Sequence, residues 1–225
     1  MVDKSPARIR AMFDQISPRY DFLNHLLSLN SDVVWRRRAA ELLGPVRTVL
    51  DVCCGTADLA IAVRRRWGAR VVGVDFSKEM LVRARRKTRA ELLQGDALRL
   101  PFRSERFDAV TFAFGIRNVA NPQHALAEMA RVLRPGGKAL ILEFTLPIRP
   151  AIRRGYLFYF SQVLPRIGKM LARAEIDAYR YLPDSVQRWF SPEELSEELR
   201  GTGFREVRHY PLSLGVAAIH IGVKP

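Results

Sequence analysis

The strongest constraint on the fold is the way residues 48–144 alternate short apolar runs with helical patterns. Five runs have the length of buried strands, and helical patterns follow the first, second and fourth of them. The runs cover residues 48–54, 71–74, 91–94, 107–114 and 138–144. Strands that alternate with helices are joined by right-handed crossovers, so the pattern predicts a parallel sheet covered by helices on both faces.

Residues that begin or end helices stand where this pattern requires them. Ser77 and Asn121 are N-cap residues by type, and Pro122 occupies a favoured first-turn position. Gly68 is placed to end the helix that follows the first strand. Ser191 opens a capping box, which predicts a further helix near the C-terminus.

The chain length of 225 residues favours one domain with appendages. Residues 1–45 are predicted to form two helices around residues 20–25, as a cover on the core. The core itself is predicted over residues 46–146. A helical, aromatic insertion over 147–190 and a C-terminal helix with a hairpin over 191–225 complete the predicted organisation.

The charge is unusual, because 37 Lys and Arg against 23 Asp and Glu leave a net charge of +14. Nucleic acid, an anionic membrane surface and an acidic small molecule all fit such an excess. The positive residues fall in separate bursts rather than one stripe, which also fits solvated helix faces. The charge alone therefore selects no partner.

Three other features of the sequence indicate the cellular compartment in which the protein is expected. No apolar run approaches the roughly 18 residues that a membrane-spanning helix needs. The first residues lack the apolar centre of a signal peptide, which predicts a cytoplasmic protein. The two cysteines, Cys53 and Cys54, are adjacent and badly placed to bridge each other, which fits a reducing compartment.

The first predicted strand runs directly into a turn at Gly55 and then into a helix. A glycine there lets a ligand approach the backbone, and the free N–H groups of the helix attract an anion. Only Gly55 remains of the three glycines that a dinucleotide motif carries, so a pyrophosphate site fits poorly. A smaller anion, such as a carboxylate, suits this turn better.

Acidic residues follow the next two strands. Asp75 is placed to accept hydrogen bonds from both hydroxyls of a ribose. Asp96 and Ala97 could read an adenine edge through a carboxylate and a backbone N–H. An acid alone at a strand end is more often a cap or turn residue than a ligand contact. Because successive strand ends meet at one edge of an open α/β sheet, the acids at these ends together predict an adenosine-containing cofactor.

These motifs resemble the S-adenosylmethionine-binding sheet of class I methyltransferases. More narrowly, several segments resemble the ubiquinone/menaquinone biosynthesis C-methyltransferases, most specifically at residues 115–118. The segments are residues 20–29, 114–118, 131–144, 164–168, 179–182, 203–204 and 215–220. The resemblance implies a Rossmann-like α/β fold whose seven-stranded sheet is mostly parallel, with an antiparallel C-terminal strand.

The resemblance also implies a reaction, the methylation of a ring carbon of a prenylated hydroquinone by S-adenosylmethionine. Residues 52–56 are similar to the menaquinone-type members, so demethylmenaquinol, converted to menaquinol, is the expected substrate. The family often has Gly where this chain has Ala57; a residue already turning into a helix should tolerate the methyl group. Carried over position by position, the cofactor contacts are Gly55, Thr56, Asp75, Phe76, Asp96 and Ala97.

In such a reaction, ionising a phenolic hydroxyl makes the neighbouring ring carbon nucleophilic, so the protein must orient the reactants and stabilise the phenolate. The resemblance assigns this task to Arg117 and Asn118, with Tyr20 closing over the ring. Arg117 is a poor base because its pKa exceeds about 12. A salt bridge for Arg117 and a packed aromatic for Tyr20 are the structural alternatives.

Several alternatives stay open. A methyltransferase acting on another small molecule, such as a ubiquinone-pathway benzoquinol, or on RNA is the nearest rival, although no nucleic-acid partner is expected. A nicotinamide oxidoreductase and a non-catalytic adenosine-binding regulator are more distant ones. The four histidines show no metal-ligand spacing, so no metal site is predicted.

The aromatic residues 156–160 have two interpretations, as a core helix or as a lid for a prenyl tail. The lid would place apolar groups beside cations that attract anionic lipid. A substrate with a long isoprenoid tail must be reached from a membrane, which predicts peripheral association with the inner face of the cell membrane. Whether the chain forms a homodimer is left open.

Overall fold

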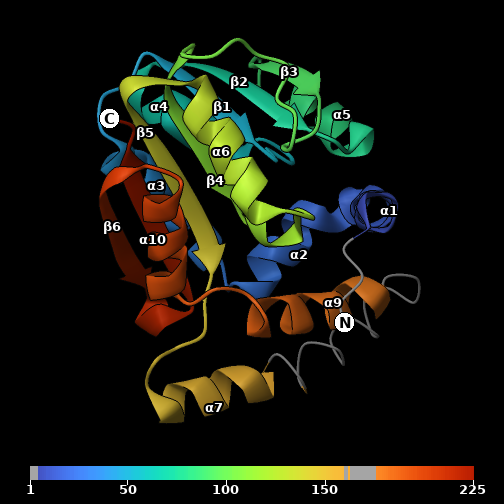
Figure 1. The fold of residues 1–225 in the computed structure, drawn as a ribbon. Helices are drawn as coiled ribbons and strands as arrows, with labels where there is room; N and C mark the ends of the chain where they lie inside the picture. The colour runs from blue at the N-terminus through green and yellow to red at the C-terminus, as the bar shows by residue number, and fades with distance from the viewer. Residues whose placement is uncertain (1–4, 160–161, 163–175) are drawn as a thin grey trace.

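The computed structural model describes residues 5–159, 162 and 176–225. In these residues seven strands form one sheet in the order β3-β2-β1-β4-β5-β7-β6 (Figure 1). The strands are β1 (Thr48–Val52), β2 (Arg70–Asp75), β3 (Glu91–Gln94), β4 (Phe107–Ala113), β5 (Leu133–Phe144), β6 (Arg205–Leu212) and β7 (Ala217–Val223). Only β7 runs antiparallel to its neighbours, β5 and β6. The predicted α/β fold is confirmed.

Helices cover both faces of the sheet, as the alternating pattern predicts (Figure 1). Along β1, Val49 packs into one hydrophobic cluster and Leu50 into the other, so this strand is buried on both sides. Helices α3 (Ser31–Leu43), α4 (Asp58–Trp67) and α5 (Lys78–Lys87) pack on the first face. Helices α6 (Pro122–Val132) and α10 (Pro192–Gly201) pack on the second.

The predicted helix ends are confirmed. The Ser77 side chain accepts a hydrogen bond from the Met80 N–H at 3.2 Å. Asn121 does the same for the His124 N–H at 2.9 Å, and Ser191 forms the complete capping box. Gly68 ends α4 in the left-handed conformation, with φ of +65°. Such caps satisfy backbone groups that the helix cannot satisfy internally.

The N-terminal prediction was wrong in detail. Three α-helices, not two, precede the sheet: α1 (Pro6–Ile16), α2 (Tyr20–Leu27) and α3, with a 3₁₀ turn at Ser17–Arg19. The segment expected to separate two helices is itself α2. Asn30 adopts a left-handed φ of +61° at the N-cap of α3, so the chain turns between α2 and α3 at this residue.

The insertion over 147–190 is partly described. It contains α7 (Pro150–Phe158) and α9 (Ile176–Gln187), whereas Phe160 and residues 164–168 lie outside the described residues. None of the α7 residues is buried, and the helix lies at the lower end of the molecule (Figure 1). Among the described helices, none is both long enough and apolar enough to cross a bilayer. The division of the chain into cover, core and insertion stays a prediction.

Candidate functional site

A pocket of about 810 Å³, including its open mouth, lies where β1, β2 and β4 end. The strand order reverses between β1 and β4, and open α/β sheets bind their ligands at such a point. The N-terminal helices form one wall through Ile9, Phe13 and Tyr20. Of the predicted cofactor contacts, Gly55, Asp75, Phe76, Asp96 and Ala97 line this pocket.

Asp75 is the buried acid of this pocket. One carboxylate oxygen accepts the Gly55 N–H at 2.8 Å, and the other accepts the Ser77 N–H at 2.9 Å. Burial raises the pKa of Asp75 to about 6, although the backbone hydrogen bonds oppose the rise. Each oxygen keeps a lone pair, so this carboxylate can accept further hydrogen bonds from two neighbouring hydroxyl groups.

The far side of the pocket combines an aromatic ring with a polar edge. Phe76 is half-buried, and its carbonyl accepts a hydrogen bond from the Gln94 amide at 3.1 Å. Asp96 is exposed and accepts the Leu98 N–H at 2.9 Å, while Ala97 is buried beside it. A flat heterocycle fits such a place, because it can stack on the ring and donate to the carboxylate.

A second, smaller pocket of about 290 Å³, including the space open to solvent, also has Gly55 in its lining. Asp51 lines it; one oxygen accepts the Thr111 hydroxyl at 2.7 Å, and the other has no partner among the described residues. Arg36 lines the same cavity. A buried acid and a buried guanidinium facing one space can hold an ammonium and a carboxylate together, as an α-amino acid carries them.

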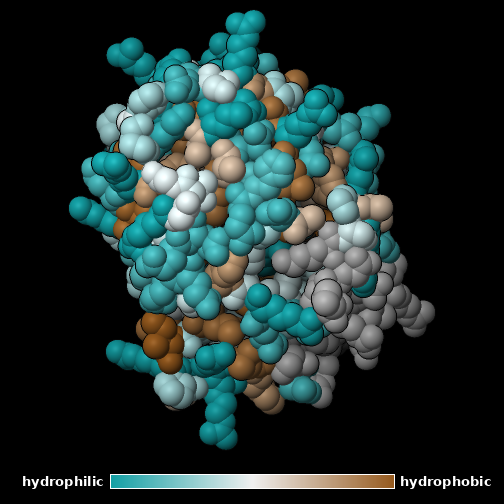
Figure 2. Space-filling view, viewed as in Figure 1, coloured by the Kyte–Doolittle hydropathy of each residue, from teal (hydrophilic) through white to brown (hydrophobic). Residues whose placement is uncertain are grey.

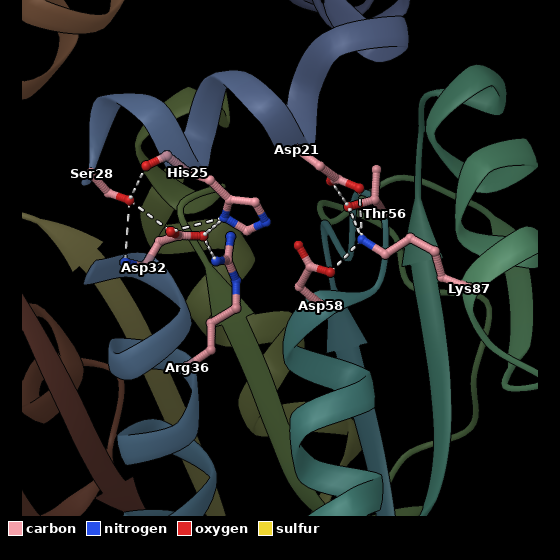
Figure 3. Close-up of polar contacts among 8 residues, drawn as sticks. All are labelled: Asp21, His25, Ser28, Asp32, Arg36, Thr56, Asp58 and Lys87. Carbon is pink, nitrogen blue, oxygen red and sulfur yellow. Dashed lines mark hydrogen bonds and ion pairs between the residues drawn. The ribbon is translucent and has the colours of Figure 1, made fainter. Parts of the chain in front are cut away.

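Arg36 is held in place by a buried polar network around Asp32 (Figure 3). The Asp32 carboxylate pairs with the Arg36 guanidinium and accepts the Ser28 hydroxyl at 2.6 Å. His25 Nδ1 lies 3.0 Å from both carboxylate oxygens. Sequence reasoning missed Arg36 because it belongs to a burst of three arginines. Its i, i+4 spacing from Asp32 was the available signal.

Burial raises the pKa of Asp51 to about 7, against an ordinary value near 4, while the Thr111 hydrogen bond opposes the rise. Between these values the folded protein binds more protons than the unfolded chain, so its stability falls as pH rises through this window. Asp51→Asn should therefore stabilise the ligand-free protein by roughly 2–4 kcal/mol at about pH 8 and by little near pH 4. Urea unfolding at both pH values measures this. An unchanged free energy of unfolding at the higher pH would contradict it.

Ala57 lies between this cavity and α4. It adopts a left-handed φ of +69° as the N-cap residue, a conformation that favours glycine. The explanation expected from the sequence, that residue 57 already turns into the helix, is therefore wrong. The methyl group is instead fully buried in the hydrophobic cluster on the α4 face, and this burial offsets the backbone strain.

Thr56 lines the smaller cavity rather than the main pocket. Its hydroxyl donates to Asp21 of α2 at 2.5 Å and accepts from the Lys87 ammonium at 3.1 Å. Lys87 also pairs with Asp21 at 2.8 Å and with Asp58 at the start of α4 (Figure 3). These contacts connect the N-terminal cover to the floor of the site. The role of Thr56 in cofactor binding stays a prediction.

Lys87→Met should loosen this connection. Its ammonium joins α2, α4 and α5 in one partly buried cluster, so its loss leaves Asp21 and Asp58 facing each other. We expect cofactor dissociation, measured by stopped-flow fluorescence, to become roughly three- to tenfold faster, which corresponds to about 1 kcal/mol. Lys78→Met, an exposed change on the same helix, is the control. Equal rates in the two variants would contradict the role of Lys87.

Of the three predicted catalytic residues, Tyr20 and Asn118 line the main pocket. Burial raises the pKa of Tyr20, opposed by the Asn24 hydrogen bond and by the charges of Arg36 and Arg117. Its hydroxyl is therefore a neutral donor at physiological pH. Asn118 is buried, and its side-chain oxygen accepts the Tyr181 hydroxyl at 2.9 Å.

Arg117 lies behind the pocket wall, buried in an ion pair. Its Nη1 donates to Glu143 at 2.6 Å and to the Phe114 carbonyl at 2.9 Å, and its Nε donates to Ser185 at 3.3 Å. Burial raises the pKa of Glu143, and the Arg117 charge opposes this most. The salt bridge weighed as the structural alternative is present. The catalytic role of Arg117 stays a prediction, and Glu143 is a partner that sequence reasoning missed.

Cys53 and Cys54 are poor nucleophiles, because burial and the nearby acids raise the pKa of both thiols. Among the residues that the structure describes, His, Cys, Asp and Glu form no cluster able to hold a metal ion.

Comparison with known proteins identifies the family. The model of the ubiE/COQ5 methyltransferase family matches residues 1–224. The chain belongs to this family. A demethylmenaquinone methyltransferase of Thermus thermophilus is 48% identical over 223 residues, which cover 95% of this chain and 100% of the relative. A ubiquinone/menaquinone biosynthesis C-methyltransferase of Geobacter sulfurreducens is 43% identical, over 96% of this chain and 88% of the relative.

Solved structures agree with the fold. An S-adenosylmethionine-dependent methyltransferase of Thermotoga maritima superposes with a TM-score of 0.71 at 21% identity, covering 96% of this chain and 100% of that chain. The likeness at this identity concerns the fold alone. The family membership establishes the chain as a methyltransferase, as the sequence resemblance implied.

Proposed function

We propose that this protein methylates a ring carbon of a prenylated hydroquinone, with S-adenosylmethionine as the methyl donor. Demethylmenaquinol is the proposed substrate and menaquinol the product. The names of the Thermus and Geobacter relatives support this assignment. The observation that carries it is a match to one methyltransferase family over nearly the whole chain, combined with acidic groups at three neighbouring strand ends.

The residues around the two cavities fit the cofactor. Asp75 would accept the two ribose hydroxyls, and Phe76, Asp96 and Ala97 would hold the adenine ring. Gly55 lines both pockets, so the amino-acid end would pass it into the smaller one. The partnerless oxygen of Asp51 supports this orientation, because an ammonium group would satisfy it. When bound, the cofactor supplies an electrophilic methyl group.

Arg36 and Asp51 extend the predicted set of cofactor contacts. Arg36 would donate to the carboxylate of the amino-acid end, from a position that Asp32 fixes. Thr56 would support this end from the side of α4, whose N-terminal N–H groups also favour an anion. The proposal thus gives a partner to both the ammonium and the carboxylate of the amino-acid end, and each of the two pockets binds one part of the cofactor.

For the quinol, the protein's own groups orient the ring and stabilise its oxygen. Tyr20 and Asn118 face the main pocket and would donate hydrogen bonds to a phenolate oxygen. Arg117 would add positive charge from behind the wall, reduced by its pairing with Glu143. Residues of α1 and α2 line the pocket and would limit its contact with water, which would strengthen these hydrogen bonds. The proposal leaves the final proton acceptor unassigned, as water or a side chain.

The experiment is a methyl-transfer assay with isotope-labelled S-adenosylmethionine, followed by mass spectrometry. Demethylmenaquinol should gain one labelled methyl group on the ring, and unmodified RNA in a parallel reaction should gain none. The demethylated benzoquinol of the ubiquinone type, in a third reaction, tests the choice of head group. A label on RNA, or on no quinol, would contradict the proposal.

A further inference from the structure

Helix α7 presents one side to the protein and the other to solvent. Tyr156 is partly buried and its hydroxyl oxygen is fully enclosed, so this side of the helix packs against the protein. Positions on the opposite side are exposed, ending in Phe158, whose relative exposure is 62%. The solvent side of α7 therefore carries a large apolar side chain in addition to its polar ones.

Two further apolar side chains stand exposed nearby. Ile148, just before α7, is 76% exposed, and Leu214, in the turn between β6 and β7, is 71% exposed. The two segments are neighbours, because Thr145 bonds to the residues that follow Leu214: its hydroxyl donates to the Gly215 carbonyl at 2.8 Å and its N–H to the Val216 carbonyl at 2.9 Å. Figure 2 shows apolar side chains gathered around the position of α7, with hydrophilic ones projecting between them.

The same surface is cationic. Arg149, Arg153 and Arg154 are exposed on α7 or at its start, and no ion pair joins them to any described residue. Apolar side chains that project between exposed arginines match a lipid surface, where acyl chains lie just beneath anionic headgroups. They match a second copy of this chain poorly, because its net charge is +14 and the same arginines would face each other.

We propose that Ile148, Leu214 and the solvent side of α7, here called the docking face, bind the surface of an anionic phospholipid membrane. The inference rests on the proposed function for its purpose, since a prenylated quinol is dissolved in the bilayer. The docking face begins where β5 ends, at the edge of the sheet that carries the site. Contact there would bring this edge of the sheet, and the site that it carries, near the lipid that holds the substrate.

Vesicle flotation tests the proposal with the full chain. Wild-type protein should float with vesicles of phosphatidylcholine and phosphatidylglycerol and much less with phosphatidylcholine alone. Arg153→Gln combined with Arg154→Gln should lower the partition coefficient roughly thirtyfold, because the variant loses two basic residues that attract the anionic surface. Leu214→Ser should weaken it roughly tenfold, through the loss of inserted apolar area.

Matched variants elsewhere control for charge and apolar area. Arg64→Gln with Arg65→Gln removes two exposed arginines from α4, and Leu29→Ser removes an equally exposed leucine. Both should leave flotation nearly unchanged. Equal losses in the matched variants, or equal binding to neutral vesicles, would overturn the proposal. Turnover of a water-soluble short-tail quinol should not change in any of these variants, which separates a failure of docking from a failure of the proposed function.

Discussion

Asp75→Asn should weaken S-adenosylmethionine binding roughly 10- to 100-fold in titration calorimetry, the largest single effect expected on the cofactor. The carboxylate accepts backbone N–H groups of Gly55 and Ser77, one on each oxygen. An asparagine must turn its amide N–H₂ toward one of these donors and toward one ribose hydroxyl. The variant therefore loses an acceptor for the ligand and disturbs the turn at Gly55 as well.

The matched comparison is Asp96→Asn, at the end of the neighbouring strand. Asp96 is exposed, so water can replace the lost interaction and the affinity should fall less than tenfold. Thermal unfolding of each variant without ligand separates lost binding from lost folding. If Asp75→Asn binds the cofactor as tightly as the wild type, Asp75 does not hold the ribose.

Arg117→Met should destabilise the fold by about 3–5 kcal/mol, because it leaves the Glu143 carboxyl buried without its partner. Protonation of Glu143 limits this cost at low pH, since burial already raises its pKa. The loss should therefore be larger at high pH than at low pH. Urea unfolding across this range measures the effect.

A second variant distinguishes structure from catalysis. Adding Glu143→Leu to Arg117→Met removes both charges together, and apolar replacement of a buried pair is often neutral for stability. If Arg117 stabilises the phenolate, the double variant should regain stability and cofactor affinity but remain slow in methyl transfer. Recovery of turnover along with stability would contradict the catalytic role and leave Arg117 as a structural residue.

The sheet could be predicted because the sequence signals for its strands and helix ends lie within short segments of the chain. Each strand of the core is a short apolar run between turn residues, and the helix caps lie within a few residues of the groups they satisfy. The C-terminal hairpin followed from two adjacent strand patterns with a short turn between them, whereas the antiparallel strand in the sheet was implied by the family resemblance. The strand ends then placed Asp75 and Asp96 on one edge, without any knowledge of side-chain contacts.

The details of the site depend on contacts between distant segments, which no local pattern encodes. Thr56 donates to Asp21, 35 positions away, so its hydroxyl is already committed within the protein. Arg36 is buried while its neighbours Arg37 and Arg38 are not, because only its side of α3 faces the sheet. Arg117 pairs with Glu143 of the adjacent strand, a partner 26 positions along the chain.

The orientation of the cofactor is the central claim, and a crystal structure with bound S-adenosylmethionine tests it most directly. The ribose should lie against Asp75, with adenine beside Phe76 and Asp96. The amino-acid end should pass Gly55, with its ammonium on Asp51 and its carboxylate on Arg36. A cofactor bound away from β1 and β2, or reversed between the two cavities, would contradict it.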